Sequence, residues 1–308
     1  MSHFTVLVIG DDVDEQLYPF SENLDYSEEE DRKFLEFYGE GNKEIEEEYA
    51  NGVVEYGDDL GKKFTEVYPK FKSFLKEWHG FEKDPHTGKL GYWRNPKAKW
   101  DWFTIGGMWT GFFKLKSGAK GVTGSPGLMT SPAKPGFVDQ VKLKNVDFLG
   151  MEEHEASLAL ERYERAERLL GGSIPELDYL WSDLISKKEY EHLNMQDKRD
   201  LYWKQPSMLL KESKLKELDS SSEDYSFLNW IDMDSFQMTK EEYIQKSREN
   251  SFSTFAVLKD GEWFERGKMG WWGSVSNEKS SEDWGREFSK LVRGLPKETL
   301  LTVVDCHI

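Results

Sequence analysis

The sequence predicts an α+β protein in which an antiparallel sheet is covered by helices. Short β-branched runs lie near both ends, at residues 4–9 and 300–307. Residues 253–266 read as a hairpin around Asp260-Gly261, a dipeptide typical of a type I′ turn. Between them lie long segments with apolar residues at helical spacing. We therefore expect an elaborated ferredoxin-like sandwich plus a helical insertion.

The N-terminal region shows one strand and two helix signals. Residues 4–9 should form a buried strand. Ser27 and Glu30 form a capping-box pattern, so we expect a helix that runs in pieces to about residue 50. A second helix is expected over 62–79, with a break at Pro69, which has no backbone N–H to donate.

The second half of the chain is predominantly helical. Helices are expected over 150–170, over 175–218 in pieces, over 239–249 and over 280–293. Ion pairs at i,i+4 spacing, Glu161–Arg165 and Glu164–Arg168, should support the first of them. We predict a core domain formed by 1–145 and 251–308, with 146–250 as the helical insertion.

One aromatic stretch stands out, residues 100–113, with three Trp and three Phe. It reads as a second hairpin, because Gly106-Gly107 accepts the positive φ angles of a tight turn. Strand alternation would place Trp100 and Trp102 on one face. Two interpretations remain open: an aromatic core element, or a stacking platform beside a ligand pocket.

The charge of the chain is −17, but it is unevenly distributed. Residues 1–80 carry 21 acids and 8 bases, whereas residues 89–145 carry 10 bases and 2 acids. The aromatic stretch therefore lies in a basic island, which suits a nucleotide-like anion. Lysines that merely solvate the outer face of the hairpin are the alternative. The candidate ligand-binding residues are Lys99, Trp100, Trp102, Trp109, Lys114, Lys120, Trp271 and Trp272.

A glycine-rich segment, residues 116–136, follows the aromatic stretch. Loops of this length are commonly functional. It could cover the hairpin as a flap, or its part 118–124 could wrap a phosphate with backbone N–H groups, although it is not a Walker A loop. The acidic residues at 11–15 match no known metal loop, so we predict neither a metal nor a cofactor.

The two ends of the chain offer a candidate catalytic cluster. If the first and last strands are antiparallel neighbours, His3 lies near Asp305 and His307, and the alternation puts them on one face. Two imidazoles with a carboxylate could perform acid–base catalysis or bind a metal. Polar residues that only close the sheet end are the alternative. His3-Phe-Thr5 resembles a motif of two-histidine phosphoesterases, but the second such motif is missing.

Composition excludes several classes of protein. The acidic charge disfavours duplex DNA binding. Cys306 is the single cysteine, so an intrachain disulfide is impossible. No apolar run reaches the roughly 20 residues of a membrane span, and the N-terminus lacks the pattern of a signal peptide. We expect a soluble intracellular protein whose oligomeric state is open.

Three stretches resemble an uncharacterised family of tailed-phage proteins. They are the opening 1–10, the aromatic stretch with its approach 95–113, and an ending made of 254–267, 269–273 and 305–308. In related sequences an Arg commonly stands where this chain has Met108. The resemblance implies a phage origin and a location in the host cytoplasm, and it implies no chemistry.

Three functions remain in competition. The first is a phage counter-defence protein that binds a nucleotide-like small molecule or a host defence protein. The second is a phosphodiester or nucleotide hydrolase that uses His3, Asp305 and His307. The third is an inhibitor of a host enzyme whose acidic residues 22–48 mimic nucleic acid.

Overall fold

The computed structural model describes residues 2–128, 130–270 and 273–308. Its class is α+β as predicted, with 40% helix and 20% strand. The chain forms two compact units. The sheet unit comprises Met1–Phe112, Ala119–Asn145 and Thr254–Ile308, and the helical unit comprises Phe113–Gly118 and Val146–Ser253. This division does not test whether the predicted domains, 1–145 with 251–308 and 146–250, fold independently, so their boundaries stay a prediction.

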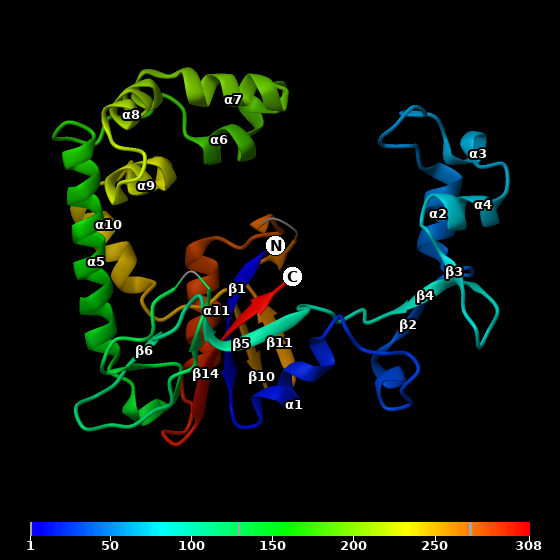
Figure 1. Cartoon of the computed structure of the whole chain (residues 1–308), viewed down its shortest axis with the longest axis horizontal. Coiled ribbons are helices and arrows are strands. Elements are labelled where there is room, and N and C mark those ends of the chain that lie inside the picture. The colour runs from blue at the N-terminus through cyan, green and yellow to red at the C-terminus, as the bar shows by residue number, and fades with distance from the viewer. Residues whose placement is uncertain (1, 129, 271–272) are drawn as a thin grey trace. The chain divides into compact units, whose positions relative to one another are not determined.

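The sheet unit is built on a seven-stranded sheet in the order β11-β10-β1-β14-β5-β7, with β9 also paired to β14 (Figure 1). Its strands are β1 (His3–Ile9), β5 (Trp102–Gly107), β7 (Ser125–Pro126), β9 (Gln140–Lys142), β10 (Ala256–Lys259), β11 (Glu262–Glu265) and β14 (Leu300–His307). The β1–β10 and β5–β7 pairs are parallel. The sheet is therefore mixed, and the expectation of a purely antiparallel sheet was wrong.

The first and last strands pair antiparallel at the centre of the sheet, as predicted. The register joins His3 to His307, Thr5 to Asp305 and Ile9 to Leu301. Strand β5 pairs on the other side of β14 and joins Trp102 to His307. Both pairings bring side chains of the same parity to the same face.

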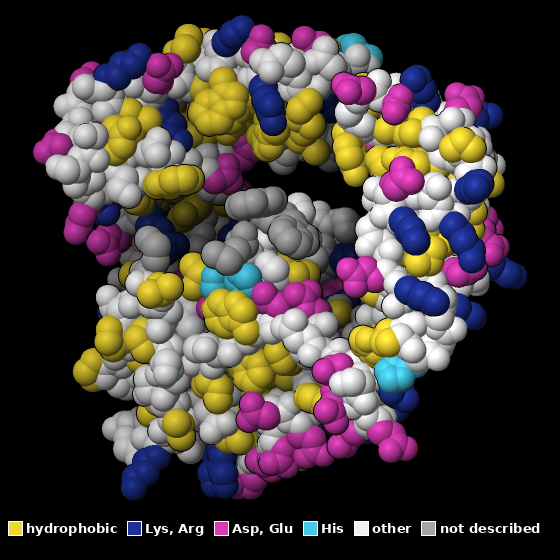
Figure 2. Space-filling view, turned by 45° about the vertical axis from the view of Figure 1, so that its right-hand side comes forward, with side chains coloured by type: hydrophobic (Ala, Val, Ile, Leu, Met, Phe, Trp, Pro, Cys, Tyr) yellow, Lys and Arg dark blue, Asp and Glu magenta, His cyan; other side chains and the backbone are white. Residues whose placement is uncertain are grey.

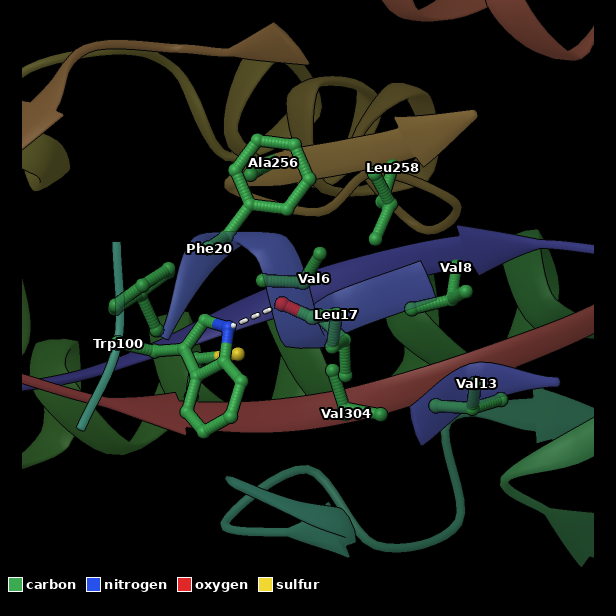
Figure 3. Packing of buried hydrophobic residues seen from close by; sticks show 11 residues of the cluster. Val6, Val8, Val13, Leu17, Phe20, Trp100, Ala256, Leu258 and Val304 are labelled. Carbon is green, nitrogen blue, oxygen red and sulfur yellow. Dashed lines mark hydrogen bonds between the residues drawn. The ribbon is translucent and has the colours of Figure 1, made fainter. Parts of the chain in front are cut away.

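The opposite face of these strands is the hydrophobic core. Val6, Val8, Val304, Ala256 and Leu258 point into it from the sheet (Figure 3). Helix α1 (Val13–Leu17) and the 3-10 turn η1 (Tyr18–Phe20) cover them. Each fully buried aliphatic side chain contributes roughly 1.5–3 kcal/mol to folding, so this face stabilises the sheet.

The aromatic stretch does not form a hairpin. Strand β5 continues through Gly106 and Gly107, and residues 108–111 form a turn. In the described part of the chain, no strand returns from this turn to pair with β5. The N–H groups of Trp109 and Thr110 donate to the carbonyls of Gly106 and Gly107. Strand β7 instead pairs with the same two glycines and forms the sheet edge beside β5. Their positive φ angles, 84° and 55°, serve this close packing rather than a two-residue turn.

Residues 31–94 carry a small antiparallel sheet and short helices. Its strands are β2 (Glu36–Gly39), β3 (Glu82–Lys83) and β4 (Leu90–Arg94), preceded by the 3-10 turn η2 (Asp31–Phe34). The helix expected from Ser27 to about residue 50 is present only in its last piece, α2 (Lys43–Asn51). Its start at Ser27 was wrong, because β2 occupies part of that range. The break at Pro69 is confirmed, since it separates α3 (Phe64–Val67) from α4 (Phe71–Glu77).

The C-terminal elements follow the prediction closely. Asp260 and Gly261 both have positive φ, 53° and 76°, as a type I′ turn between β10 and β11 requires. Helix α11 (Ser281–Val292) is capped by Ser280, whose hydroxyl accepts the N–H of Asp283. The short strands β8 (Phe137–Val138), β12 (Lys268–Met269) and β13 (Val275–Ser276) complete the sheet unit.

The helical unit contains the expected helices. They are α5 (Phe148–Leu169), α6 (Trp181–Ser186), α7 (Met195–Lys204), α8 (Pro206–Glu217), α9 (Glu223–Trp230) and α10 (Lys240–Glu249), with β6 (Phe113–Lys114) and 3-10 turns η4 (Lys188–Tyr190) and η5 (Asp234–Phe236). Thr239 and Glu242 form a capping box on α10. Arg165 and Arg168 both bind Asp224 instead of the glutamates expected on their own helix. Among the described residues, no helix is long and apolar enough to cross a membrane.

Candidate functional site

Polar and aromatic side chains occupy one end of the face of β1, β14 and β5 that lies opposite the core of Figure 3; further along the same face, Leu7, Leu301 and Val303 are fully buried. His3 and Thr5 come from β1, Asp305 and His307 from β14, and Trp102 from β5. They lie at one end of the sheet, where the first strand begins and the last strand ends. The register that buries Phe4 and Cys306 on the other face necessarily places these residues here.

Asp305 holds the His3 ring. The Nδ1 atom of His3 lies 3.0 Å from Oδ1 and 3.2 Å from Oδ2 of Asp305. Oδ2 also accepts the backbone N–H of Met108 at 2.9 Å. The carboxylate side chain is only 2% exposed, whereas that of His3 is 29% exposed. The turn after β5 thus fixes the carboxylate, and the carboxylate fixes the imidazole.

A second carboxylate, Asp101, holds the His307 ring. Its Oδ1 atom lies 2.7 Å from Nδ1 of His307, and its backbone N–H donates to the His307 carbonyl at 2.9 Å. The Nε2 atom of His307 is buried and has no hydrogen-bond partner among the described residues. The sequence analysis missed Asp101, because its role depends on the pairing of β5 with β14. The β5–β14 register joins Trp102 to His307, and Asp101 precedes the strand, so strand alternation gives no signal that its side chain meets His307.

The two imidazoles and Trp102 form one aromatic cluster. The ring centroids of His3 and His307 are 5.0 Å apart. The Trp102 ring stacks on His307 at 4.8 Å with an interplanar angle of 15°, and His3 meets it edge-on at 5.5 Å. Trp102 remains 44% exposed, so part of its ring is available to a ligand.

The surroundings of this cluster are acidic. Partial burial raises the pKa of Glu22, and the nearby charge of Asp101 raises it further, while His307 lowers it. Glu22 is held beside Asp101 because its backbone N–H donates to the Trp100 carbonyl. With Asp305, three carboxyl groups thus accompany two imidazoles. Such a site favours a cation or a singly charged anion over a polyphosphate.

The glycine-rich segment packs against β5. Asp139, which is fully buried, accepts the N–H groups of Gly111 at 2.6 Å and Phe112 at 3.2 Å through Oδ1, and that of Gly124 at 2.8 Å through Oδ2. A Cβ on Gly124 would lie 2.0 Å from the Ile105 carbonyl oxygen. Residues 121–127 are therefore part of the sheet edge, so for this part of the segment 116–136 the interpretation as a flap was wrong.

The hydrogen bonds made by this segment also argue against a phosphate-binding loop at 118–124. The N–H of Gly124 binds this internal carboxylate, and the N–H of Val122 donates to the Gln140 carbonyl. These donors are consequently not available to a phosphate. Nothing in the spacing of the sequence distinguishes a loop that binds its own aspartate from one that binds an external anion.

The structure separates the predicted ligand-binding residues. Trp100 is only 8% exposed and donates its indole N–H to the Leu17 carbonyl in the core (Figure 3). Lys99 pairs with Glu265 at 2.8 Å. Lys120 is exposed and Trp109 is half-buried. Lys114 belongs to the helical unit, and Trp271 and Trp272 lie outside the described residues.

The prediction that Trp100 and Trp102 share one face was therefore wrong, because the strand begins only at Trp102. On the face that Figure 2 draws, Lys and Arg side chains lie spread out with acidic side chains among them. In the basic island, Lys142 and Lys144 both pair with Glu298.

No group of three or more His, Cys, Asp or Glu side chains within 2–128, 130–270 and 273–308 is arranged to hold a metal ion. Comparison with protein families, with curated proteins and with solved structures found no match to this chain.

Proposed function

We propose that this protein cleaves a phosphodiester or nucleotide by acid–base catalysis with His3 and His307. The observation that supports this proposal is the pair of carboxylate-held imidazoles, whose ring centroids lie 5.0 Å apart. A carboxylate at Nδ1 fixes the ring and keeps the proton on that nitrogen, so that Nε2 can exchange a proton with a substrate.

The two imidazoles differ in access to water, and this suggests their roles. His3, which is 29% exposed, would take a proton from an attacking water through Nε2. His307, which is 5% exposed, would hold a proton on Nε2 and give it to the leaving oxygen. Asp305 and Asp101 act as positioning residues. Paired proton transfer of this kind typically accelerates a reaction 10²–10⁴-fold for each group.

The surroundings restrict the substrate. Glu22, Asp101 and Asp305 would repel a di- or triphosphate, so a phosphodiester with one negative charge is the better fit. The exposed part of Trp102 offers a stacking surface to a nucleobase, an interaction worth about 1–3 kcal/mol for one base. A cyclic or short oligonucleotide meets both conditions.

A second candidate function is binding without turnover. The exposed ring of Trp102 supports it, as does the resemblance of residues 1–10, 95–113 and 305–308 to tailed-phage proteins. In this version the protein acts in the host cytoplasm as a counter-defence factor that sequesters a nucleotide signal or a host defence protein.

Incubation with 2′,3′-cyclic nucleotides, cyclic dinucleotides and short oligonucleotides, followed by chromatography of the products, tests the proposal. We expect turnover that falls at least 100-fold in His3→Ala and is retained in His192→Ala, since His192 is exposed in the helical unit. Turnover that survives in His3→Ala would reject the assignment. Thermal stabilisation by the same compounds without product would favour the binding function.

On the fold, we propose that β1, β10, β11, α11 and β14 form a variant of the ferredoxin-like sandwich. Helix α11 connects the hairpin to a last strand that is antiparallel to the first. The neighbour of β1 is the first strand of that hairpin, β10, and this pairing is where the variant departs from the expected pattern.

A further inference from the structure

The two-histidine cluster has the features of a site for a transition-metal ion. Histidines that bind metals commonly donate their second ring nitrogen to a carboxylate, which fixes the tautomer and raises the basicity of the ligating nitrogen. Both histidines here have that arrangement, His3 with Asp305 and His307 with Asp101. The nitrogen left with a lone pair is Nε2 in each ring.

The buried Nε2 atom of His307 suggests a bound partner that the described residues do not supply. The His307 side chain is 5% exposed, and its buried Nε2 has no hydrogen bond to any residue in the described part of the chain. Buried polar atoms in folded proteins nearly always have a partner, so an exception calls for an explanation such as a bound ion. A metal ion that accepts the Nε2 lone pair would be such an explanation.

The spacing of the rings fits a shared ion. Zinc binds imidazole nitrogen at about 2.0–2.1 Å, so two imidazoles on one tetrahedral ion have ring centroids roughly 5 Å apart. The observed separation of the His3 and His307 centroids is 5.0 Å. The rings are also tilted by 73°, so neither ring blocks the other by stacking on it.

The charge around the cluster favours a cation. Asp101 and Asp305 contact the two rings directly, and Glu22, whose pKa is raised by burial and then by the charge of Asp101, lies nearby. Imidazole nitrogen selects zinc, nickel or copper over magnesium or calcium, which prefer oxygen. Since no third His, Cys, Asp or Glu among the described residues completes the group, water would fill the other positions.

We propose that the Nε2 atoms of His3 and His307 bind one Zn²⁺ ion and that this ion inhibits the acid–base chemistry of the same nitrogens. The binding half of the proposal stands on the geometry alone. The inhibition half rests on the proposed function, because it requires that both nitrogens be free during turnover.

Isothermal titration of the full chain with ZnCl₂ tests the binding half. We expect one ion per chain, no heat from MgCl₂ at the same concentration, and affinity that falls as the pH is lowered, because protons compete for imidazole nitrogen. His3→Ala should weaken binding at least ten-fold, and His192→Ala should leave it unchanged. Absent binding, or binding unchanged in His3→Ala, would overturn the site.

His307 is buried, so His307→Ala could fail to fold. Binding of Co²⁺ to the unaltered protein avoids this difficulty, since its visible absorption reports nitrogen ligation. A spectrum identical to that of Co²⁺ in water would also overturn the site.

Turnover assays with and without a chelator distinguish failure of the two proposals. Turnover that persists in the chelator and stops with added Zn²⁺ supports both. Turnover that is unchanged by added Zn²⁺ overturns the proposed inhibition. Zinc binding by a protein that turns over none of the phosphodiesters overturns the proposed function and leaves the metal site standing.

Discussion

The two faces of β1, β14 and β5 differ in what holds their side chains. On the core face, Phe4, Cys306 and Phe103 pack among apolar neighbours, and any side chain of similar shape would serve. On the other face, His3, Asp305 and His307 are held by specific hydrogen bonds at 2.7–3.0 Å. The core face is therefore tolerant and supplies stability, whereas the end of the opposite face that carries these three residues is exacting and supplies geometry.

The exacting face depends on elements outside the three strands. Asp305 is fixed by the amide of Met108, and the turn that carries this amide is fixed by Asp139 through Gly111. Changes on the core face should therefore alter stability most, whereas changes among His3, Asp305 and His307 should alter activity or metal binding most.

The largest expected difference between the faces concerns two tryptophans. Trp100→Ala removes a buried indole from the core and should cost about 3–5 kcal/mol of unfolding free energy. Trp102→Ala, on the exposed stacking face, should cost about 1 kcal/mol or less. Urea denaturation measures both. Equal costs would contradict the division of the faces.

The buried carboxylate of Asp139 offers the next largest effect. Asp139→Asn replaces one acceptor oxygen by a donor, so one of the N–H groups of Gly111 and Gly124 loses its partner, at a cost of about 2–3 kcal/mol. Asp147→Asn is the matched control, because Asp147 caps α5 through one bond to Gly150 and Asn caps equally well. A neutral Asp139→Asn would show that the carboxylate does not organise the turn.

Gly107→Ala should disturb the site directly. A Cβ on Gly107 would lie 2.3 Å from the Asp305 Cβ, so Asp305 must move, and we expect a cost of about 1–3 kcal/mol together with loss of zinc binding. Gly118→Ala is the control. Its φ of 74° is similarly positive, but a Cβ there meets nothing within 4 Å, so only the backbone strain of about 1 kcal/mol remains. Denaturation and titration with Zn²⁺ measure the two effects.

The smallest effect concerns Cys306, on the core face directly behind the site. Burial raises its thiol pKa well above the ordinary value of 9.0, and Asp305 and Asp101 add to this effect. The folded protein keeps this proton where the unfolded chain loses it, so stability that is full below pH 9 declines as the pH rises above 9. Cys306→Ala should show a shallower decline. Rapid labelling of the native thiol by a disulfide reagent at pH 8 would contradict its burial.

Local rules predicted the elements whose signals lie within a few residues. Capping at Thr239 and Ser280, the break at Pro69 and the turn at Asp260-Gly261 each depend on short-range hydrogen bonds or backbone angles. The stretch after Ser27 shows the limit of such rules. Its capping-box pattern is a local preference, and pairing of β2 with β4, more than fifty residues away, outweighs it.

By itself, the sequence determined the class of the protein, its terminal strands and the shared parity of His3, Asp305 and His307, because strand alternation is a property of the backbone. The tertiary structure alone decided which strands became neighbours. Long-range pairing placed Asp101 beside His307, sent Trp100 into the core while Trp102 stayed exposed, and put Asp139 where a phosphate was expected. These outcomes depend on burial and register between distant segments, and no single segment encodes them.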